Sequence, residues 1–167
     1  SGWITGPYVE ASGMKAKTLL AALSTAVIAL AALLYLQTGP VQTQADKTVF
    51  EVYHSPDCGC CREYIGYLRA SGAEVRVKHA ENMQAVKERF NIPRQLWSCH
   101  TSIVEGYFVE GHVPLEAVRK LLDTRPAVDG LALPGMPAGS PGMGGVKTEP
   151  FTIYSSTNGV ASVFMRL

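Results

Sequence analysis

The sequence predicts a mixed α/β domain that begins near Asp46 and runs to Leu167. Three observations support this prediction. Segments with the alternation of β-strands take turns with segments of helical periodicity. A cluster of cysteines follows the first predicted strand directly, where the first helix begins. A stretch rich in Gly, Pro and Met then separates this part from a final pair of strands.

The first strand is expected at Thr48–His54, which is rich in β-branched and aromatic residues and stops at Ser55-Pro56. A helix should follow the cysteines, because Ile65 and Leu68 recur at helical spacing. This helix should stop near Ser71-Gly72, since Gly commonly ends helices.

A second strand and helix are expected at Glu74–His79 and Asn82–Phe90. The strand alternates valines with charged residues, which is typical of a half-buried strand. The helix places three apolar residues on one face, and we expect these to point inward: Met83, Val86 and Phe90.

The last elements of the unit are a hairpin and a helix. Thr101–Val104 and Tyr107–Val109 flank Glu105-Gly106 as hairpin strands do. Pro114 should open a helix that runs through Leu122. The order β-α-β-α-β-β-α, with cysteines at the first turn, is the thioredoxin arrangement, so we expect a thioredoxin-like domain.

Two further segments complete the chain. Ala127–Val146 contains so many Gly and Pro residues that we expect neither helix nor strand there, but a long loop or flap. The C-terminal segments Phe151–Tyr154 and Val160–Met165 flank Asn158-Gly159, which predicts a β-hairpin with a type I′ turn. We expect this hairpin to add to an edge of the sheet.

The N-terminal part predicts export. Residues 1–13 have no periodic pattern and precede Met14, so we interpret them as a leader that is not native to the protein. Thr18–Leu36 is uncharged and apolar behind the positive pair Lys15 and Lys17. This pattern indicates either a signal peptide or a membrane-anchor helix.

Both interpretations place the domain in the same compartment. Thr43-Gln44-Ala45 is a tolerable cleavage site, so residues 14–45 are expected to be a signal peptide or an anchor with its linker. The lysines stay in the cytoplasm in both cases, and the domain of residues 46–167 should lie in the periplasm. Contact with the inner membrane is expected only if the segment is not cleaved.

The charge of the domain argues against nucleic acid as a partner. After Ala45 the sequence has 13 Lys or Arg and 13 Asp or Glu. No basic cluster stands out that could bind a phosphate backbone.

Three thiols crowd the start of the first helix, in Cys58-Gly59-Cys60-Cys61. Cys58 and Cys61 keep the C-x-x-C spacing of thiol redox sites, and Cys60 is the additional one. A helix N-terminus carries partial positive charge, which favours the thiolate form that attacks disulfides and binds metals.

The fourth cysteine, Cys99, is expected to lie beside this cluster, because in a thioredoxin arrangement its segment packs against the C-x-x-C turn. Thiolates are soft donors that suit Cu(I), zinc or iron–sulfur clusters. Three thiols on one turn can bridge several ions more readily than they can enclose one tetrahedral ion. The pattern therefore favours copper(I), in a site with room for more than one ion.

Three alternatives remain open at this stage. Two structural disulfides could join the four cysteines, since the expected compartment is oxidising. A thiol-disulfide oxidoreductase would use Cys58 to attack and Cys61 to resolve. A zinc site could form from Cys58 and Cys61 with Cys99 and His100, which would leave Cys60 unused.

Further side chains near the expected site are weaker candidates. Met136 and Met143 lie in the Gly- and Pro-rich loop, and thioethers bind Cu(I) better than zinc. His100 follows Cys99 directly and could be a ligand or could orient one. We expect no metal ligation by His54 or His112, which lack ligand spacing, and we interpret Trp97 as a core or rim aromatic.

Several motifs together resemble one known family, the CopG family of bacterial copper-resistance proteins, whose metal-binding domain was long of unknown function. The motifs are Asp57-Cys58-Gly59-Cys60-Cys61, Ser98-Cys99-His100-Thr101, Val104-Glu105-Gly106-Tyr107, Glu110-Gly111-His112-Val113-Pro114, and Gly130–Pro137 with Ser140-Pro141-Gly142-Met143. The resemblance covers most of Thr48–Leu167. It implies a thioredoxin-like fold, a periplasmic setting, and a copper centre at Cys58, Cys60 and Cys61 with Cys99 alongside.

The expected function is copper(I) binding for copper resistance or homeostasis. The expected partners are copper ions and other periplasmic proteins that handle copper. A binding role is favoured over catalysis, and redox activity of the copper or the thiols is left open.

Overall fold

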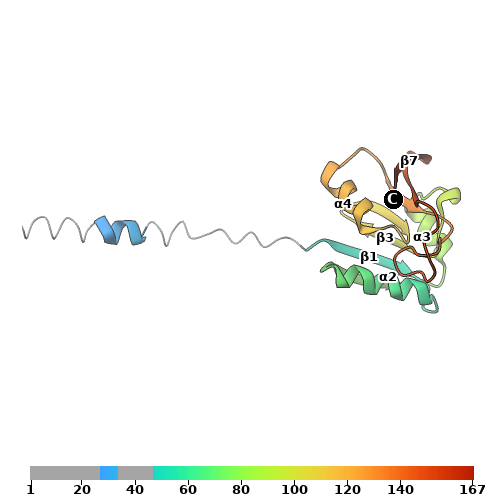
Figure 1. Ribbon diagram of the computed structural model, residues 1–167, viewed down its shortest axis with the longest axis horizontal. Coiled ribbons are helices and arrows are strands. Elements are labelled where there is room, and N and C mark those ends of the chain that lie inside the picture. Colours follow the sequence, from blue (N-terminus) through green and yellow to red (C-terminus); the bar gives the residue numbers. More distant parts are fainter. Residues whose placement is uncertain (1–26, 34–46) are drawn as a thin grey trace, which may run out of the picture. The chain divides into compact units, whose positions relative to one another are not determined.

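The computed structural model describes residues 27–33 and 47–167 (Figure 1). Residues 27–33 are helical, and residues 47–167 belong to one compact unit. None of the helices in these two described ranges is long and apolar enough to cross a membrane. Most of the predicted export segment Thr18–Leu36 lies outside the described residues, so its role stays a prediction.

The compact unit alternates strands and helices along the chain. Its elements are β1 (Val49–His54), α2 (Gly59–Ala70), β2 (Glu74–His79), α3 (Met83–Arg89), the 3-10 turn η1 (Arg94–Leu96), β3 (Thr101–Val104), β4 (Tyr107–Gly111), α4 (Leu115–Thr124), β5 (Gly130–Leu133), β6 (Thr152–Thr157) and β7 (Val160–Arg166). The predicted order β-α-β-α-β-β-α is therefore present from β1 to α4.

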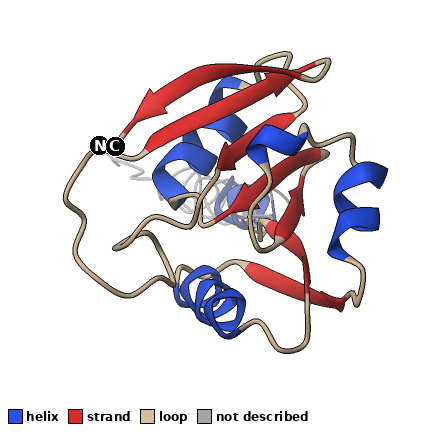
Figure 2. Ribbon diagram, turned by 90° about the vertical axis from the view of Figure 1, so that its right-hand side faces the viewer, coloured by secondary structure: helices blue, strands red, loops and turns tan. Residues whose placement is uncertain are grey.

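The strands form one seven-stranded sheet in the order β2-β1-β3-β4-β5-β6-β7 (Figure 2). β1 pairs in parallel with β2, and β4 with β5, while the other neighbouring pairs are antiparallel. The last two strands form the predicted C-terminal hairpin, with positive φ angles at Asn158 and Gly159 as a type I′ turn requires. The hairpin extends the sheet on one side, as expected.

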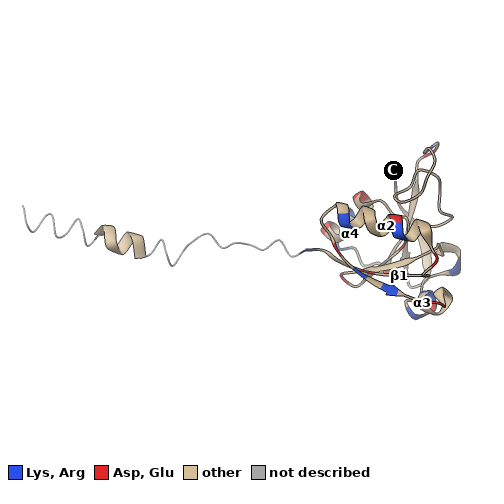
Figure 3. Ribbon diagram, turned by 90° about the horizontal axis from the view of Figure 1, so that it is seen from below, with Lys and Arg blue, Asp and Glu red and all other residues tan. Residues whose placement is uncertain are grey.

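Apolar side chains cover both faces of the sheet. Helices α2 and α4 pack on one face, where their buried leucines and valines contact Phe50 and Val52 of β1. A smaller cluster on the other face joins Leu96 of η1 to Phe108 of β4. The sheet is thus the middle of three layers. Lys, Arg, Asp and Glu are interspersed over the domain (Figure 3), in keeping with its balanced charge.

The segments that contain the cysteines and His112 meet at one edge of the sheet, where β1 and β4 end and β3 begins. The register pairs His54 at the end of β1 with His79 at the end of β2, and Thr101 at the start of β3 with Glu110 near the end of β4. The cysteine turn after β1, the Cys99 segment before β3 and the residues that follow β4 therefore meet at this edge. The loop that follows β5 begins at the same edge, because β4 and β5 are parallel.

Strand β5 corrects the prediction that Ala127–Val146 contains neither helix nor strand. All four residues of Gly130–Leu133 are buried, and they pair with β4 on one side and with β6 on the other. Gly130 is required there, since a Cβ atom would collide with the backbone and ring of Phe108. A strand that is buried on both faces has a short apolar sequence without alternation. When Gly and Pro flank such a sequence, its pattern does not indicate a strand.

Helix α3 buries a different residue from those predicted. Met83, Val86 and Phe90 are half-buried, whereas the side chain of Lys87 is buried. The periodicity of apolar residues could not indicate the burial of Lys87, because a lysine is expected to face solvent. The partner of Lys87 lies beneath the candidate site.

Candidate metal centre

The local sequence places three cysteines around the first turn of α2. Cys58 is the N-cap, and its backbone N–H donates to the Ser55 carbonyl at 3.0 Å, which closes the turn after β1. Cys60 and Cys61 follow in the first turn, which contains no acidic residue. The partial positive charge of the helix N-terminus is therefore not offset locally, and it favours thiolates.

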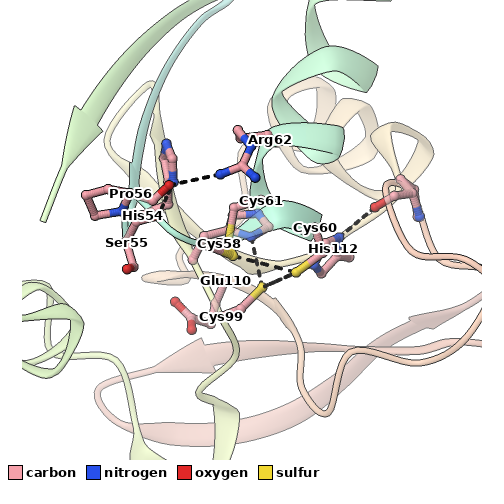
Figure 4. Close-up of a disulfide and its surroundings, with 12 residues drawn as sticks. His54, Ser55, Pro56, Cys58, Cys60, Cys61, Arg62, Cys99, Glu110 and His112 are labelled. Atoms are coloured by element: carbon pink, nitrogen blue, oxygen red, sulfur yellow. Dashed lines mark hydrogen bonds between the residues drawn. A yellow bond between two sulfur atoms is a disulfide. The ribbon is translucent and has the colours of Figure 1, made fainter. Parts of the chain in front are cut away.

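Folding brings the fourth cysteine to this turn. The Sγ atom of Cys60 lies 3.6 Å from that of Cys58 and 3.8 Å from that of Cys99 (Figure 4). The Sγ atoms of four cysteines lie within 4.8 Å of one another, and we call these residues the thiol cluster: Cys58, Cys60, Cys61 and Cys99. The predicted approach of Cys99 to the other three is thus observed.

Cys58 and Cys61 are joined by a disulfide, with their Cα atoms 5.3 Å apart. Cys60 and Cys99 are free thiols. The alternative of two structural disulfides is therefore wrong for this form of the chain, which contains one. The structure shows the oxidised form of the C-x-x-C pair, so two of the four predicted ligands become available only after reduction.

A second group of donors shares Cys99 with the thiol cluster. The Sγ atom of Cys99 lies 3.2 Å from Nδ1 of His100 and 3.1 Å from Nε2 of His112. These donor atoms also lie within 4.8 Å of one another, and we call Cys99, His100 and His112 the sulfur–imidazole group. The predicted proximity of His100 is observed, and Cys99 is the residue that connects both groups.

His112 was not expected among the ligands, but the structure places it in the site. Its Nδ1 lies 2.7 Å from the Pro141 carbonyl, which can only accept, so Nδ1 carries the proton. Nε2 then presents its lone pair to Cys99. A backbone carbonyl that fixes the tautomer of a ligand histidine is a frequent feature of metal sites. The spacing of His112 along the chain did not indicate a ligand. Its position directly after β4 could have indicated one, because β4 ends where the cysteine segments meet.

Burial keeps both imidazoles of this group neutral. Burial lowers the pKa of His100 well below its ordinary value, and the nearby His112 and Lys87 lower it further. Burial also lowers the pKa of His112, although the Pro141 carbonyl partly offsets this. Neutral imidazole is the form that binds metal ions. The buried Nε2 of His100 has no hydrogen-bond partner among the described residues.

The thiol of Cys99 is protonated at neutral pH when no metal is bound. Burial, followed by the neighbouring Cys60, raises its pKa to about 12. A metal ion that binds Cys99 must therefore displace this proton, which couples metal binding to pH.

The loop after β5 packs on the site. Gly142 lies against the start of α2 with φ at +79°, and a Cβ atom there would come within 2.6 Å of the backbone nitrogen of Tyr64. Met143 is half-buried, and the side chain of Met136 is 41% exposed. Ligation by either methionine stays a prediction.

Three other aromatic side chains near the site have structural contacts. Tyr64 is buried, packs against His100 with the rings tilted and their centroids 4.6 Å apart, and donates its hydroxyl hydrogen to the Val113 carbonyl. Trp97 donates its Nε1 hydrogen to the Ile92 carbonyl and packs in the smaller core cluster, as its interpretation as a core or rim aromatic requires. His54 packs against His79.

These donors fit a soft metal ion. Thiolates with neutral imidazole suit Cu(I), and they also suit zinc. After reduction of the Cys58–Cys61 disulfide the helix turn would offer three thiols, and Cys99 is shared by the two donor groups, an arrangement that suits bridging thiolates.

Comparisons with known proteins indicate a copper-related family. A family model described as "Protein of unknown function, DUF411" matches residues 96–143. Two solved structures, of "Copper resistance protein copG" in forms 2 and 1, are each 39% identical with a TM-score of 0.68. The matches cover 73% of this chain and 99% and 98% of the solved chains. A comparison with curated proteins found no match.

Proposed function

The chain belongs to the CopG family of copper resistance proteins, and from this premise we propose that it binds copper(I) in the periplasm through the thiol cluster. Membership of the family and the gathered cysteines support a copper-related role. The observation that carries the proposal is the approach of Cys99 to Cys60, 39 positions earlier in the chain, at 3.8 Å between their sulfur atoms.

More than one copper ion is proposed, because Cys99 belongs to two donor groups. A thiolate sulfur can bridge two ions, and Cys99 has Cys60 on one side and the two imidazoles on the other. One ion held by the cysteines and another held toward His112 would share it. Met136 and Met143 are proposed as additional ligands, since the loop that contains them packs on α2.

Binding of copper by all four cysteines requires reduction of the Cys58–Cys61 disulfide. Two electrons and two protons, supplied by a dithiol donor, convert it into two thiols. Copper(I) then displaces the thiol protons as it binds. The positive end of α2 stabilises the thiolates that result.

The periplasmic setting rests on the N-terminal sequence. Lys15 and Lys17 precede the apolar stretch Thr18–Leu36, as in exported proteins. The domain would have the thioredoxin-like fold that its element order indicates. It would exchange copper with other periplasmic copper-handling proteins, and it would contact the inner membrane if the stretch is retained.

The test is a metal titration of the reduced full chain, purified in mild detergent without oxygen. We expect more than one tightly bound Cu(I) per chain and weaker binding of Zn(II). The variant Cys60→Ser should lower the copper count. An unchanged count in this variant would contradict the proposed cluster.

A second candidate function is thiol-disulfide exchange, which the Cys58–Cys61 disulfide at the start of α2 favours. In that function Cys58 attacks a substrate disulfide and Cys61 resolves the mixed disulfide, while Cys60 takes no part. The same variant separates the two candidates, because Cys60→Ser should leave disulfide turnover intact. Loss of copper with retained turnover would show that the chain performs both.

A further inference from the structure

We propose that Glu110 is a positioning residue for the metal centre: its buried carboxylate holds the residues on both sides of Cys99 and His100, Ser98 by its backbone N–H and Thr101 by its hydroxyl. This rests on the proposed function only for the claim that Cys99 binds copper. The positioning itself concerns the metal-free protein.

The need for positioning follows from where Cys99 lies. It belongs to the segment between η1 and β3, which is neither helix nor strand. The ladder of β3 begins only at Thr101, so regular backbone hydrogen bonds do not fix Cys99 itself. The three cysteines of α2, in contrast, are held by the helix.

Glu110 supplies the missing restraint with both carboxylate oxygens. Oε1 accepts the backbone N–H of Ser98 at 2.6 Å, and Oε2 accepts the hydroxyl hydrogen of Thr101 at 2.6 Å. Ser98 and Thr101 flank Cys99 and His100 directly, so one carboxylate restrains the segment at both ends. Glu110 is placed for this because it pairs with Thr101 across β3 and β4.

The next two residues of the chain complete the same arrangement. Gly111 allows Ser98 to approach, since a Cβ atom at position 111 would come within 2.6 Å of the Cβ of Ser98. Its N–H also donates to the His100 carbonyl at 2.9 Å. His112 then brings its imidazole to Cys99.

Lys87 forms a buried ion pair with Glu110 and helps to hold its carboxylate in place. Burial raises the pKa of Glu110, and the nearby Lys87 opposes this rise. Its Nζ lies 2.5 Å from Oε1 of Glu110 and 3.2 Å from the Thr101 hydroxyl. The two charged side chains are only 4% and 0% exposed, respectively. Burying such a charge requires a partner of opposite sign.

Two double variants separate positioning from mere packing. Lys87→Met with Glu110→Gln removes both charges but leaves an amide oxygen that can accept from Ser98. Lys87→Met with Glu110→Leu removes both charges and the acceptor. Both are neutral and similar in shape, so they differ chiefly in the hydrogen bonds offered to the Cys99 segment. Equal thermal midpoints would show that they match in stability.

The first readout is cross-linking of Cys60 to Cys99 in metal-free chains that also carry Cys58→Ser and Cys61→Ser. Dibromobimane, which joins neighbouring thiols, should react more slowly with the Leu variant than with the parent, because the Cys99 segment has lost both of its attachments to residue 110. The Gln variant should regain most of the parent rate. Equal rates in the Leu variant and the parent, or equal losses in the Leu and Gln variants, would overturn the proposal.

The second readout is the Cu(I) affinity of the same two variants with all four cysteines present. We expect a loss of roughly 10–100-fold for the Leu variant and recovery by the Gln variant. If the parent binds no copper, the proposed function fails, while the cross-linking result still decides whether Glu110 positions Cys99.

A single substitution covers the case in which the Leu variant does not fold. Thr101→Val keeps the Lys87–Glu110 pair and the Ser98 hydrogen bond but removes the second attachment of the carboxylate. It should slow cross-linking in the same direction with a smaller effect. An unchanged rate in a folded Thr101→Val chain would then overturn the proposal.

Discussion

The helix side of the metal centre and its loop side are held in different ways. Cys58, Cys60 and Cys61 stand within four residues on one turn of α2, and local backbone geometry places them. Cys99 and His112 come from two separate segments, and tertiary contacts place them. The helix side can therefore form with little help from the rest of the fold, whereas the loop side depends on buried polar groups far along the chain.

This difference assigns separate tasks to the two sides. The helix side can be oxidised and reduced, because Cys58 and Cys61 are close enough to form a disulfide. The loop side offers one thiol and two neutral imidazoles. Reduction would then change the number of sulfur ligands on the helix side only, and the loop side would keep its donors in both redox forms.

The largest effect should come from removing the imidazole that anchors the loop side. His112→Phe keeps an aromatic ring in the site but removes Nε2, so Cu(I) affinity of the reduced chain should fall by at least about tenfold, since even losing a group that orients a ligand costs roughly that much. His79→Phe, at an exposed histidine outside both donor groups, is the matched control and should leave the affinity unchanged. Equal affinities of the His112→Phe variant and the parent would mean that His112 does not bind the metal.

A smaller effect concerns pH and the buried imidazole of His100 in metal-free protein. Because burial lowers the pKa of His100 when the chain is folded, the unfolded chain binds a proton more readily below its ordinary pKa of about 6.5. The free energy of unfolding should therefore fall as the pH drops below that value, by up to about 1.4 kcal/mol per pH unit. Urea unfolding between pH 7 and pH 5 measures this slope.

The variant His100→Phe provides the comparison for that slope. Phenylalanine retains packing against Tyr64, whose ring centroid lies 4.6 Å from that of His100, but it cannot take up a proton. The slope should become shallower in the variant. The same slope in both proteins would assign the acid sensitivity to other groups.

Local patterns in the sequence predicted most of the fold and one side of the site. Alternation and helical periodicity indicated the elements from β1 to α4 and the last hairpin, because each pattern reports its own backbone. The spacing of Cys58, Cys60 and Cys61 indicated the helix side for the same reason. Cys99 was correctly expected nearby, but only through an argument about the arrangement of the whole domain.

Features that depend on tertiary contacts were missed. His112 has no ligand spacing, and its role appears only when the end of β4 meets the Cys99 segment. Lys87 looks like a solvent-facing residue, and its burial depends on Glu110, 23 positions later in the chain. Strand β5 lies in a segment full of Gly and Pro, and its pairing with two neighbouring strands could not be read locally.

The central claim is that both sides form one metal centre, and a double-mutant cycle between Cys60 and Cys99 tests it most directly. Cu(I) affinity would be measured for the reduced parent, Cys60→Ser, Cys99→Ser and the double variant. We expect each single variant to lose nearly as much affinity as the double variant, because residues that share a site are strongly coupled. Losses that simply add would contradict the claim and would place the two cysteines in independent sites.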